Sequence, residues 1–176
     1  MRRAFSAGVA VTCTAVLFAG AGAAHPDHAH TPAAHAAIAA TAATSKPPTK
    51  NQIAGLFNRW NATLAKGDAR RVADLYAPNA VLLPTVSSRI RTNRAAIVDY
   101  FQHFLESKPS GRIQKRYITI LDPCHAVDTG LYQFTLTDKN SGTVSRTNAR
   151  YTYVYERRGG RWLILNHHSS AVPAGD

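Results

Sequence analysis

The chain has 176 residues, a length that accommodates one domain with a terminal tail. Apolar residues make up 45% of it, enough for a hydrophobic core, and 21 Lys and Arg against 10 Asp and Glu give a net charge of +11. The length excludes a protein kinase or a two-domain dehydrogenase, and two cysteines exclude a disulfide-rich scaffold. No segment reaches the roughly 18 consecutive apolar residues of a transmembrane helix, so stable membrane insertion is not expected.

Residues 1–24 are predicted to be an export signal. Arg2 and Arg3 form a basic start, residues 7–19 are mostly apolar, and the small residues 21–24 resemble a cleavage site. The apolar segment is too short and too rich in alanine to span a bilayer. We therefore expect cleavage near residue 24 and a secreted or periplasmic protein, exported by the general secretory or the twin-arginine route.

Residues 25–50 are rich in Ala, Thr and Pro and are predicted to be a flexible linker, because this composition cannot build a core. Four histidines lie in its first part: His25, His28, His30 and His35. Their imidazoles suit copper, nickel or zinc. We favour a solvated tail, because ordering a mobile chain around a metal costs conformational entropy.

Helices are predicted for the first part of the folded segment, 51–173. Apolar residues recur at helical spacing from Ile53 to Leu64, and Gly67 is suited to end that helix. Asp68 and Asn93 are suited to cap two further helices. The elements expected before residue 109 are helices over 51–66, 69–76 and 93–107 and short strands over 80–83 and 88–91.

The second part of the folded segment is predicted to consist of strands, because apolar and polar residues alternate and Tyr, Thr and Val are frequent. The expected strands are 112–121, 131–137, 143–157 and 162–170, and the turns between them are 128–130, 138–142 and 158–160. Helices followed by hairpin-linked strands indicate an α+β fold, with an antiparallel sheet packed against helices on one face.

Several segments resemble known families. Residues 74–80 (Asp-Leu-Tyr-Ala-Pro-Asn-Ala) look like the opening of the NTF2-like fold. Residues 120–123, 146–147, 157–162 (Arg-Arg-Gly-Gly-Arg-Trp) and 167–173 (His-His-Ser-Ser-Ala-Val-Pro) resemble the association (hub) domain of calcium/calmodulin-dependent protein kinase II. The likeness covers about residues 50–173. It implies an NTF2-like cone, in which a curved antiparallel or mixed sheet wraps around about three helices, with a conical pocket and oligomers built through the outer sheet face.

The resemblance also suggests pocket residues. The candidates are Trp60, Tyr76, Gln133, Tyr151, Tyr153, His167 and Ser169. Aligning the shared motifs places Gln133, Tyr153 and Ser169 where the kinase hub carries arginines that receive anionic ligands. This departure from the hub suggests that the pocket takes a neutral or aromatic ligand instead.

Catalysis by a pocket carboxylate is not favoured, because each acidic residue of the folded segment has a structural alternative. Asp122, Asp128 and Asp138 in particular are assigned to strand ends or turns, away from the apolar mid-strand positions where burial raises a pKa. The first hypothesis is thus an oligomeric ligand-binding domain without kinase activity, calmodulin requirement or cofactor. The alternative is an isomerase-like or oxidoreductase-like enzyme that uses His167 or His168 with pocket tyrosines.

The partners expected are a second copy of the chain and a small molecule. A third hypothesis, an envelope-binding or metal-scavenging protein, rests on the basic surface and the histidine-rich tail. Nucleic acid is not expected, because the arginines are dispersed and no nucleic-acid-binding module is present. A two-residue period divides the last strands into two faces. We assign Tyr132, Phe134, Trp162 and Ile164 to the outer, subunit-contacting face, and Leu131, Gln133, Leu163 and Leu165 to the pocket side.

Overall fold

The computed structural model describes residues 46–174, apart from residue 86. The predicted export signal and the four linker histidines lie outside the described residues. Within the described part, no helix has the length and apolar character needed to cross a membrane. The elements are α2 (Lys50–Leu64), α3 (Ala69–Ala73), β1 (Tyr76–Leu83), α4 (Arg94–Phe104), a 3-10 turn (Leu105–Ser107), β2 (Ser110–Asp122), β3 (His125–Thr137), β4 (Val144–Arg158) and β5 (Arg161–Ala171).

Polar caps define where the helices begin. The Thr49 hydroxyl accepts a hydrogen bond from the backbone N–H of Gln52, and the Gln52 side chain accepts one from the N–H of Thr49, which completes a capping box for α2. Asp68 caps α3, and the Asn93 side chain accepts from the N–H of Ala96 at the start of α4. The caps predicted at Asp68 and Asn93 are confirmed.

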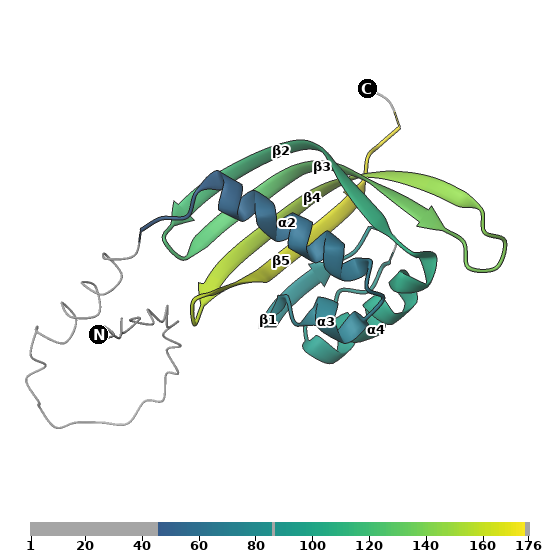
Figure 1. Cartoon of the computed structure of the whole chain (residues 1–176), viewed down its shortest axis with the longest axis horizontal. Helices are drawn as coiled ribbons and strands as arrows, with labels where there is room; N and C mark the ends of the chain where they lie inside the picture. Colours follow the sequence, from purple (N-terminus) through teal and green to yellow (C-terminus); the bar gives the residue numbers. More distant parts are fainter. Residues whose placement is uncertain (1–45, 86, 175–176) are drawn as a thin grey trace, which may run out of the picture.

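The five strands form one curved, mixed sheet in the order β1-β5-β4-β3-β2. β1 pairs with β5 in parallel, whereas the other neighbours are antiparallel. Figure 1 shows that α2 crosses the concave face of the sheet, and that α3 and α4 lie together beside β1. The predicted α+β class, with a curved sheet around three helices, is confirmed.

Several elements differ from the sequence-based expectation. The strand expected over 88–91 is reduced to a single bridge between Arg91 and Leu82, and the helix expected over 93–107 ends at Phe104, before the 3-10 turn. The helix expected over 69–76 ends at Ala73, because Tyr76 already pairs with Ile164 of β5 and begins β1. The turn expected at 128–130 lies inside β3, which starts at His125 directly after a tight turn at residues 123–124.

Gly130 explains the misplaced turn. It faces a bulge in β2, where the pairing shifts between Ile113 and Lys115. A Cβ atom built on Gly130 would lie 1.9 Å from the carbonyl oxygen of Lys115. Glycine is therefore present because two strand backbones approach closely, which is a second common use of glycine besides turns.

The predicted assignment of side chains to the two sheet faces is wrong in phase. Tyr132, Phe134 and Ile164 are only 2%, 7% and 2% exposed and belong to the core. Contacts with α2 determine which side chains of the sheet face the core. The ring of Phe57 lies 6.4 Å from that of Tyr132, and the ring of Trp60 lies 6.1 Å from that of Phe134. The fourth residue of the predicted outer set, Trp162, is partly buried against the same core.

Gln133, which was predicted to lie on the pocket side, needs the opposite correction. Its amide donates to Asn148 Oδ1 across an exposed part of the sheet at 2.9 Å, so Gln133 lies on the outer face and not in the pocket. In β5 a bulge breaks the simple alternation, because Val154 pairs with Asn166 while Tyr155 pairs with Ile164. A strict two-residue period cannot anticipate that irregularity.

Candidate functional site

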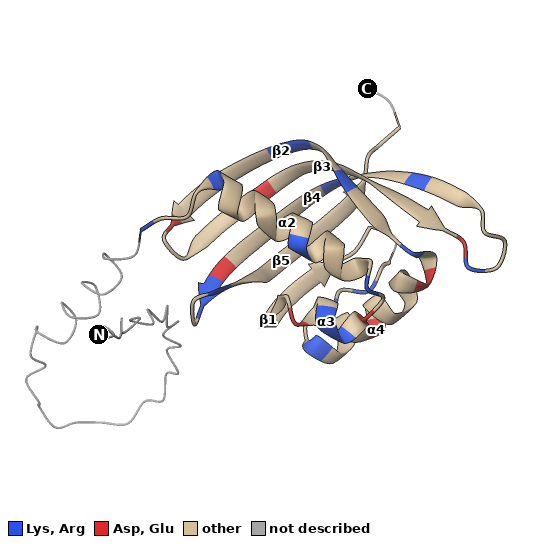
Figure 2. Ribbon diagram, in the orientation of Figure 1, with Lys and Arg blue, Asp and Glu red and all other residues tan. Residues whose placement is uncertain are grey.

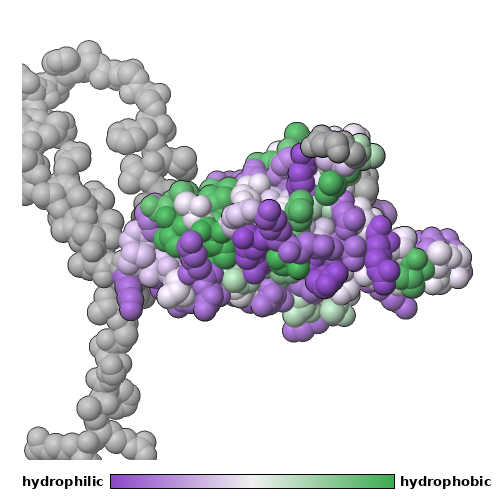
Figure 3. Space-filling model, turned by 90° about the horizontal axis from the view of Figure 1, so that it is seen from above, coloured by the Kyte–Doolittle hydropathy of each residue, from purple (hydrophilic) through white to green (hydrophobic). Residues whose placement is uncertain are grey.

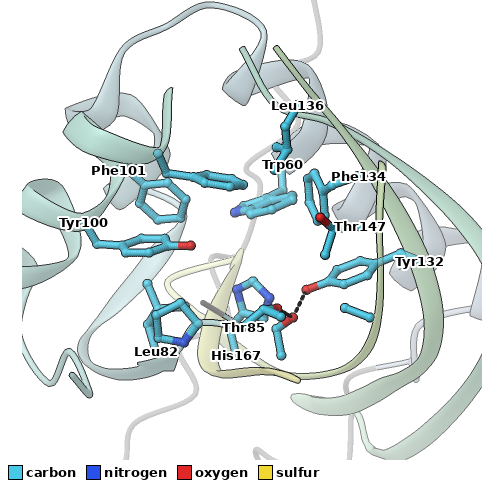
Figure 4. Close-up of a pocket in the computed structure, with 14 residues that line it drawn as sticks. Trp60, Leu82, Thr85, Tyr100, Phe101, Tyr132, Phe134, Leu136, Thr147 and His167 are labelled. Atoms are coloured by element: carbon cyan, nitrogen blue, oxygen red, sulfur yellow. Dashed lines mark hydrogen bonds between the residues drawn. The ribbon is translucent and has the colours of Figure 1, made fainter. Parts of the chain in front are cut away.

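A pocket lies on the concave side of the sheet, between α2, α4 and the strands β3 to β5 (Figure 4). Its cavity volume is about 50 Å³, and the empty space rises to about 510 Å³ when the opening to solvent is included. Its walls are mainly aromatic and aliphatic. The lining residues are Trp60, Leu82, Pro84, Thr85, Tyr100, Phe101, Phe104, Tyr132, Phe134, Leu136, Thr147, Ala149, His167 and Ser169.

Trp60 organises the aromatic wall. This α2 residue is 2% exposed, and its indole makes edge contacts with Phe101, Phe134 and His167 at ring-centroid distances of 6.3, 6.1 and 5.5 Å. Edge-to-face contacts of this kind contribute beyond simple burial and favour one geometry. These contacts therefore hold the rings of the wall in one arrangement.

A buried hydrogen-bonded chain joins Trp60 to His167 through Tyr76. The indole N–H of Trp60 donates to the Tyr76 hydroxyl oxygen at 3.2 Å, and that hydroxyl lies 2.9 Å from His167 Nδ1. Since the indole is only a donor, the Tyr76 proton is available to Nδ1. When the Tyr76 hydroxyl donates to Nδ1, the neutral imidazole carries its own proton on Nε2.

His167 is held neutral by its surroundings. It is 4% exposed, and burial, with a smaller contribution from His168, lowers its pKa to about 3. The ring also stacks on Tyr153, its cross-strand neighbour, at 4.1 Å and 26°. A histidine in this state is a weak base at neutral pH, but its N–H is an effective hydrogen-bond donor.

Hydroxyl groups form a second polar chain in the wall. Tyr132 donates to Ser169 Oγ at 2.5 Å, and Ser169 in turn is hydrogen-bonded to Thr85. Burial raises the pKa of Tyr132 well above its usual value and raises that of Tyr100 to about 12. These phenols thus stay protonated and uncharged at physiological pH.

The structure brings together most of the residues predicted for the site. Trp60, His167 and Ser169 line the pocket, and Tyr76 and Tyr153 lie directly behind His167. The other two predicted residues do not line it: Tyr151 is buried farther along β4, and Gln133 lies on the outer face.

Four polar lining residues were missed by sequence reasoning: Thr85, Tyr100, Tyr132 and Thr147. Tyr132 was assigned to the wrong face, and Thr85 follows Pro84 in a loop without a periodic pattern. Tyr100 lies in α4 at helical spacing from Ile97 and Phe104, and this spacing is the sequence signal that could have found it.

Asp128 contradicts the expectation that no carboxylate occupies a buried mid-strand position. It is 0% exposed, accepts a hydrogen bond from the Tyr151 hydroxyl at 2.9 Å, and pairs with Arg116 at 3.2 Å. Burial raises the pKa of Asp128, although the Arg116 charge opposes that change. Asp128 is not among the pocket-lining residues, and none of the described residues that line the pocket is an Asp or Glu.

The sequence of the described domain identifies its family. The family model of the calcium/calmodulin dependent protein kinase II association domain matches residues 49–173. The chain belongs to this family. No curated protein is significantly similar to it in sequence.

Solved structures agree with this membership of the association domain family. A Xanthomonas campestris protein described as such a domain is 48% identical, with a TM-score of 0.71, and the match covers 88% of this chain and 100% of that one.

More distant neighbours share the fold alone. A Streptomyces avermitilis protein described as a dehydratase of the NTF2-like family is 13% identical, with a TM-score of 0.62 and coverage of 70% and 97%. An Erwinia carotovora protein described as ketosteroid isomerase-like is 13% identical, with a TM-score of 0.58 and coverage of 69% and 95%.

Proposed function

We propose that this association domain is an exported homo-oligomer that binds a small, largely neutral or aromatic molecule in its pocket and has no kinase activity. The observation that carries the ligand proposal is the chemistry of the pocket wall. None of its described lining residues is a Lys, Arg, Asp or Glu, and its single histidine is kept neutral by burial. Export is proposed from the sequence of residues 1–24.

The wall favours uncharged ligands for a simple energetic reason. A carboxylate moved from water into such a pocket loses its hydration and contacts no charged lining residue, which costs several kcal/mol. The guanidinium of Arg91 lies 5.3 Å from the Tyr100 ring centroid but does not line the pocket. The lysines and arginines of the described domain are instead dispersed over the ribbon, as Figure 2 shows. A flat neutral molecule loses little hydration and gains contact with Trp60, Phe101 and Phe134.

We expect an aromatic ketone to bind at least about tenfold more tightly than the matching carboxylate, because only the carboxylate loses a charged group's hydration. The test is a titration at pH 7 with acetophenone and with benzoate, followed by the fluorescence of Trp60. The chain has two tryptophans, so a Trp162→Phe protein isolates the pocket signal. Equal or tighter binding of benzoate would contradict the proposal.

The geometry gives less support to the alternative, an isomerase-like or oxidoreductase-like enzyme. Proton abstraction needs a base near the ligand with a pKa close to the working pH. The pKa of His167 is far below that range. The buried Asp128 already accepts a hydrogen bond from Tyr151 and forms an ion pair with Arg116. The neighbours described as a dehydratase and as isomerase-like are too distant in sequence to carry an activity to this chain.

Self-association is proposed through the outer sheet face. Cross-strand pairs place Val127 beside Val154 and Thr129 beside Thr152 at the centre of this face. At the edge strand β2, Tyr117 pairs with Thr129 and is 59% exposed. Figure 3 shows apolar patches between hydrophilic side chains on the molecular surface seen from above. β-branched and aromatic side chains in a flat array suit a sheet-to-sheet contact between subunits.

A further inference from the structure

One polar atom of the pocket wall is left without a partner. His167 Nε2 is buried, and no hydrogen-bond partner for it is found among the described residues. A buried donor left unpaired costs about 1–3 kcal/mol, so such atoms in folded proteins usually have a specific explanation. The atom belongs to a ring that lines the pocket, which makes a pocket occupant the natural partner.

The remaining contacts of His167 indicate whether that partner donates or accepts a hydrogen bond. Nδ1 is engaged by the Tyr76 hydroxyl, whose oxygen is in turn engaged by Trp60. With Tyr76 as the donor to Nδ1, the imidazole proton is on Nε2, and the partner of Nε2 then accepts a hydrogen bond.

Other polar groups of the wall do not supply that acceptor. Ser169 accepts from Tyr132 and is also hydrogen-bonded to Thr85, so these hydroxyls satisfy one another. Figure 4 shows the labelled rings of Trp60, Tyr100, Tyr132 and His167 arranged around one space, into which a ligand atom would project.

We propose that the Nε2–H of His167 is the specificity-determining donor of the pocket, and that it selects neutral aromatic ligands with an acceptor oxygen, such as a ketone carbonyl. The inference rests on the proposed function, since it requires a ligand in the same pocket. It adds that an aromatic hydrocarbon of the same shape is discriminated against, because it leaves Nε2 unpaired.

The test compares acetophenone with α-methylstyrene, in which a C=CH₂ group replaces C=O and the shape is retained. Affinities of both are measured by ligand-observed NMR for the wild-type protein and for His167→Phe. The substitution keeps a ring against Tyr153 and Trp60 but removes the donor. We expect the ratio of the two dissociation constants, which cancels their different hydration, to change by about tenfold in favour of the hydrocarbon in His167→Phe.

A second measurement does not depend on the folding of the variant. The ¹⁵N spectrum of the wild-type imidazoles at pH 7 should show His167 protonated on Nε2. That resonance should shift when acetophenone is added and stay in place when α-methylstyrene is added.

The outcomes separate the two proposals. If both probes bind and their ratio is the same in wild type and in His167→Phe, or if the Nε2 resonance responds equally to both, the pocket function stands and the role of His167 is overturned. If His167 carries its proton on Nδ1, the role of His167 is likewise overturned. If neither probe binds the wild-type protein, the proposed function itself is overturned, and this inference with it.

Discussion

Gly130→Ala is expected to lower the free energy of unfolding by about 3 kcal/mol, at the upper end of the range for overpacking. The added methyl group would lie 1.9 Å from the carbonyl oxygen of Lys115, a backbone atom that cannot rotate away. Either β2 or β3 must therefore move, and the pairing around the bulge would weaken. Urea unfolding followed by circular dichroism measures the change.

Gly55→Ala is the matched control for this substitution. Gly55 lies in α2, and no atom lies within 4 Å of a Cβ built on it. The same change is therefore expected to raise the free energy of unfolding by roughly 0.5–1 kcal/mol, because alanine has less conformational freedom to lose in a helix. A Gly130→Ala protein as stable as the wild type would show that the two strands do not approach as described.

Val154→Asp is expected to convert the proposed oligomer into monomers that are still folded. Val154 pairs with Val127 at the centre of the outer sheet face, where an aspartate would place a charge in an apolar subunit contact. An unpaired charge buried in such a contact costs about 3–5 kcal/mol. Since about 1.4 kcal/mol is a tenfold change, the dissociation constant should rise by roughly two to four orders of magnitude. Size-exclusion chromatography with light scattering measures the mass, and circular dichroism shows whether the fold is kept.

Val144→Asp provides the control at a second valine. Val144 begins β4 at the β3–β4 hairpin and is 60% exposed, away from the centre of the face. We expect Val144→Asp to keep the oligomer. If Val154→Asp keeps the oligomer and Val144→Asp dissociates it, the subunit contact involves the hairpin and not the centre of the sheet.

The fold could be predicted from the sequence because its signals are local. The helical spacing from Ile53 to Leu64, the caps at Asp68 and Asn93 and the alternating strands each depend on nearby residues. The phase of the sheet faces depends on contacts distant in sequence, here those of Phe57 and Trp60 with β3. Assigning Tyr132 to the outer face therefore failed, although the two-residue period itself was correct.

The candidate site likewise contains some residues that local sequence patterns predict and others that depend on contacts distant in sequence. His167 and Ser169 were found because they follow one another at strand spacing in a segment with a recognisable family motif. Asp128 was missed because Thr129 and Gly130 after it form a typical turn sequence, and only the bulge in β2 explains why a glycine is needed inside a strand. Bulges are set by pairing between strands, and a single sequence does not display them.

Native mass spectrometry of the protein recovered after export tests the central claim most directly, because one spectrum reports subunit mass, subunit number and any retained small molecule. We predict subunits that begin near residue 25, assembled as a dimer or larger oligomer, with a small neutral adduct that is lost on collisional activation. Thr147→Phe, which introduces a ring into the pocket wall, should keep the assembly and lose the adduct. Monomers without an adduct, or an adduct that Thr147→Phe retains in full, would contradict the account.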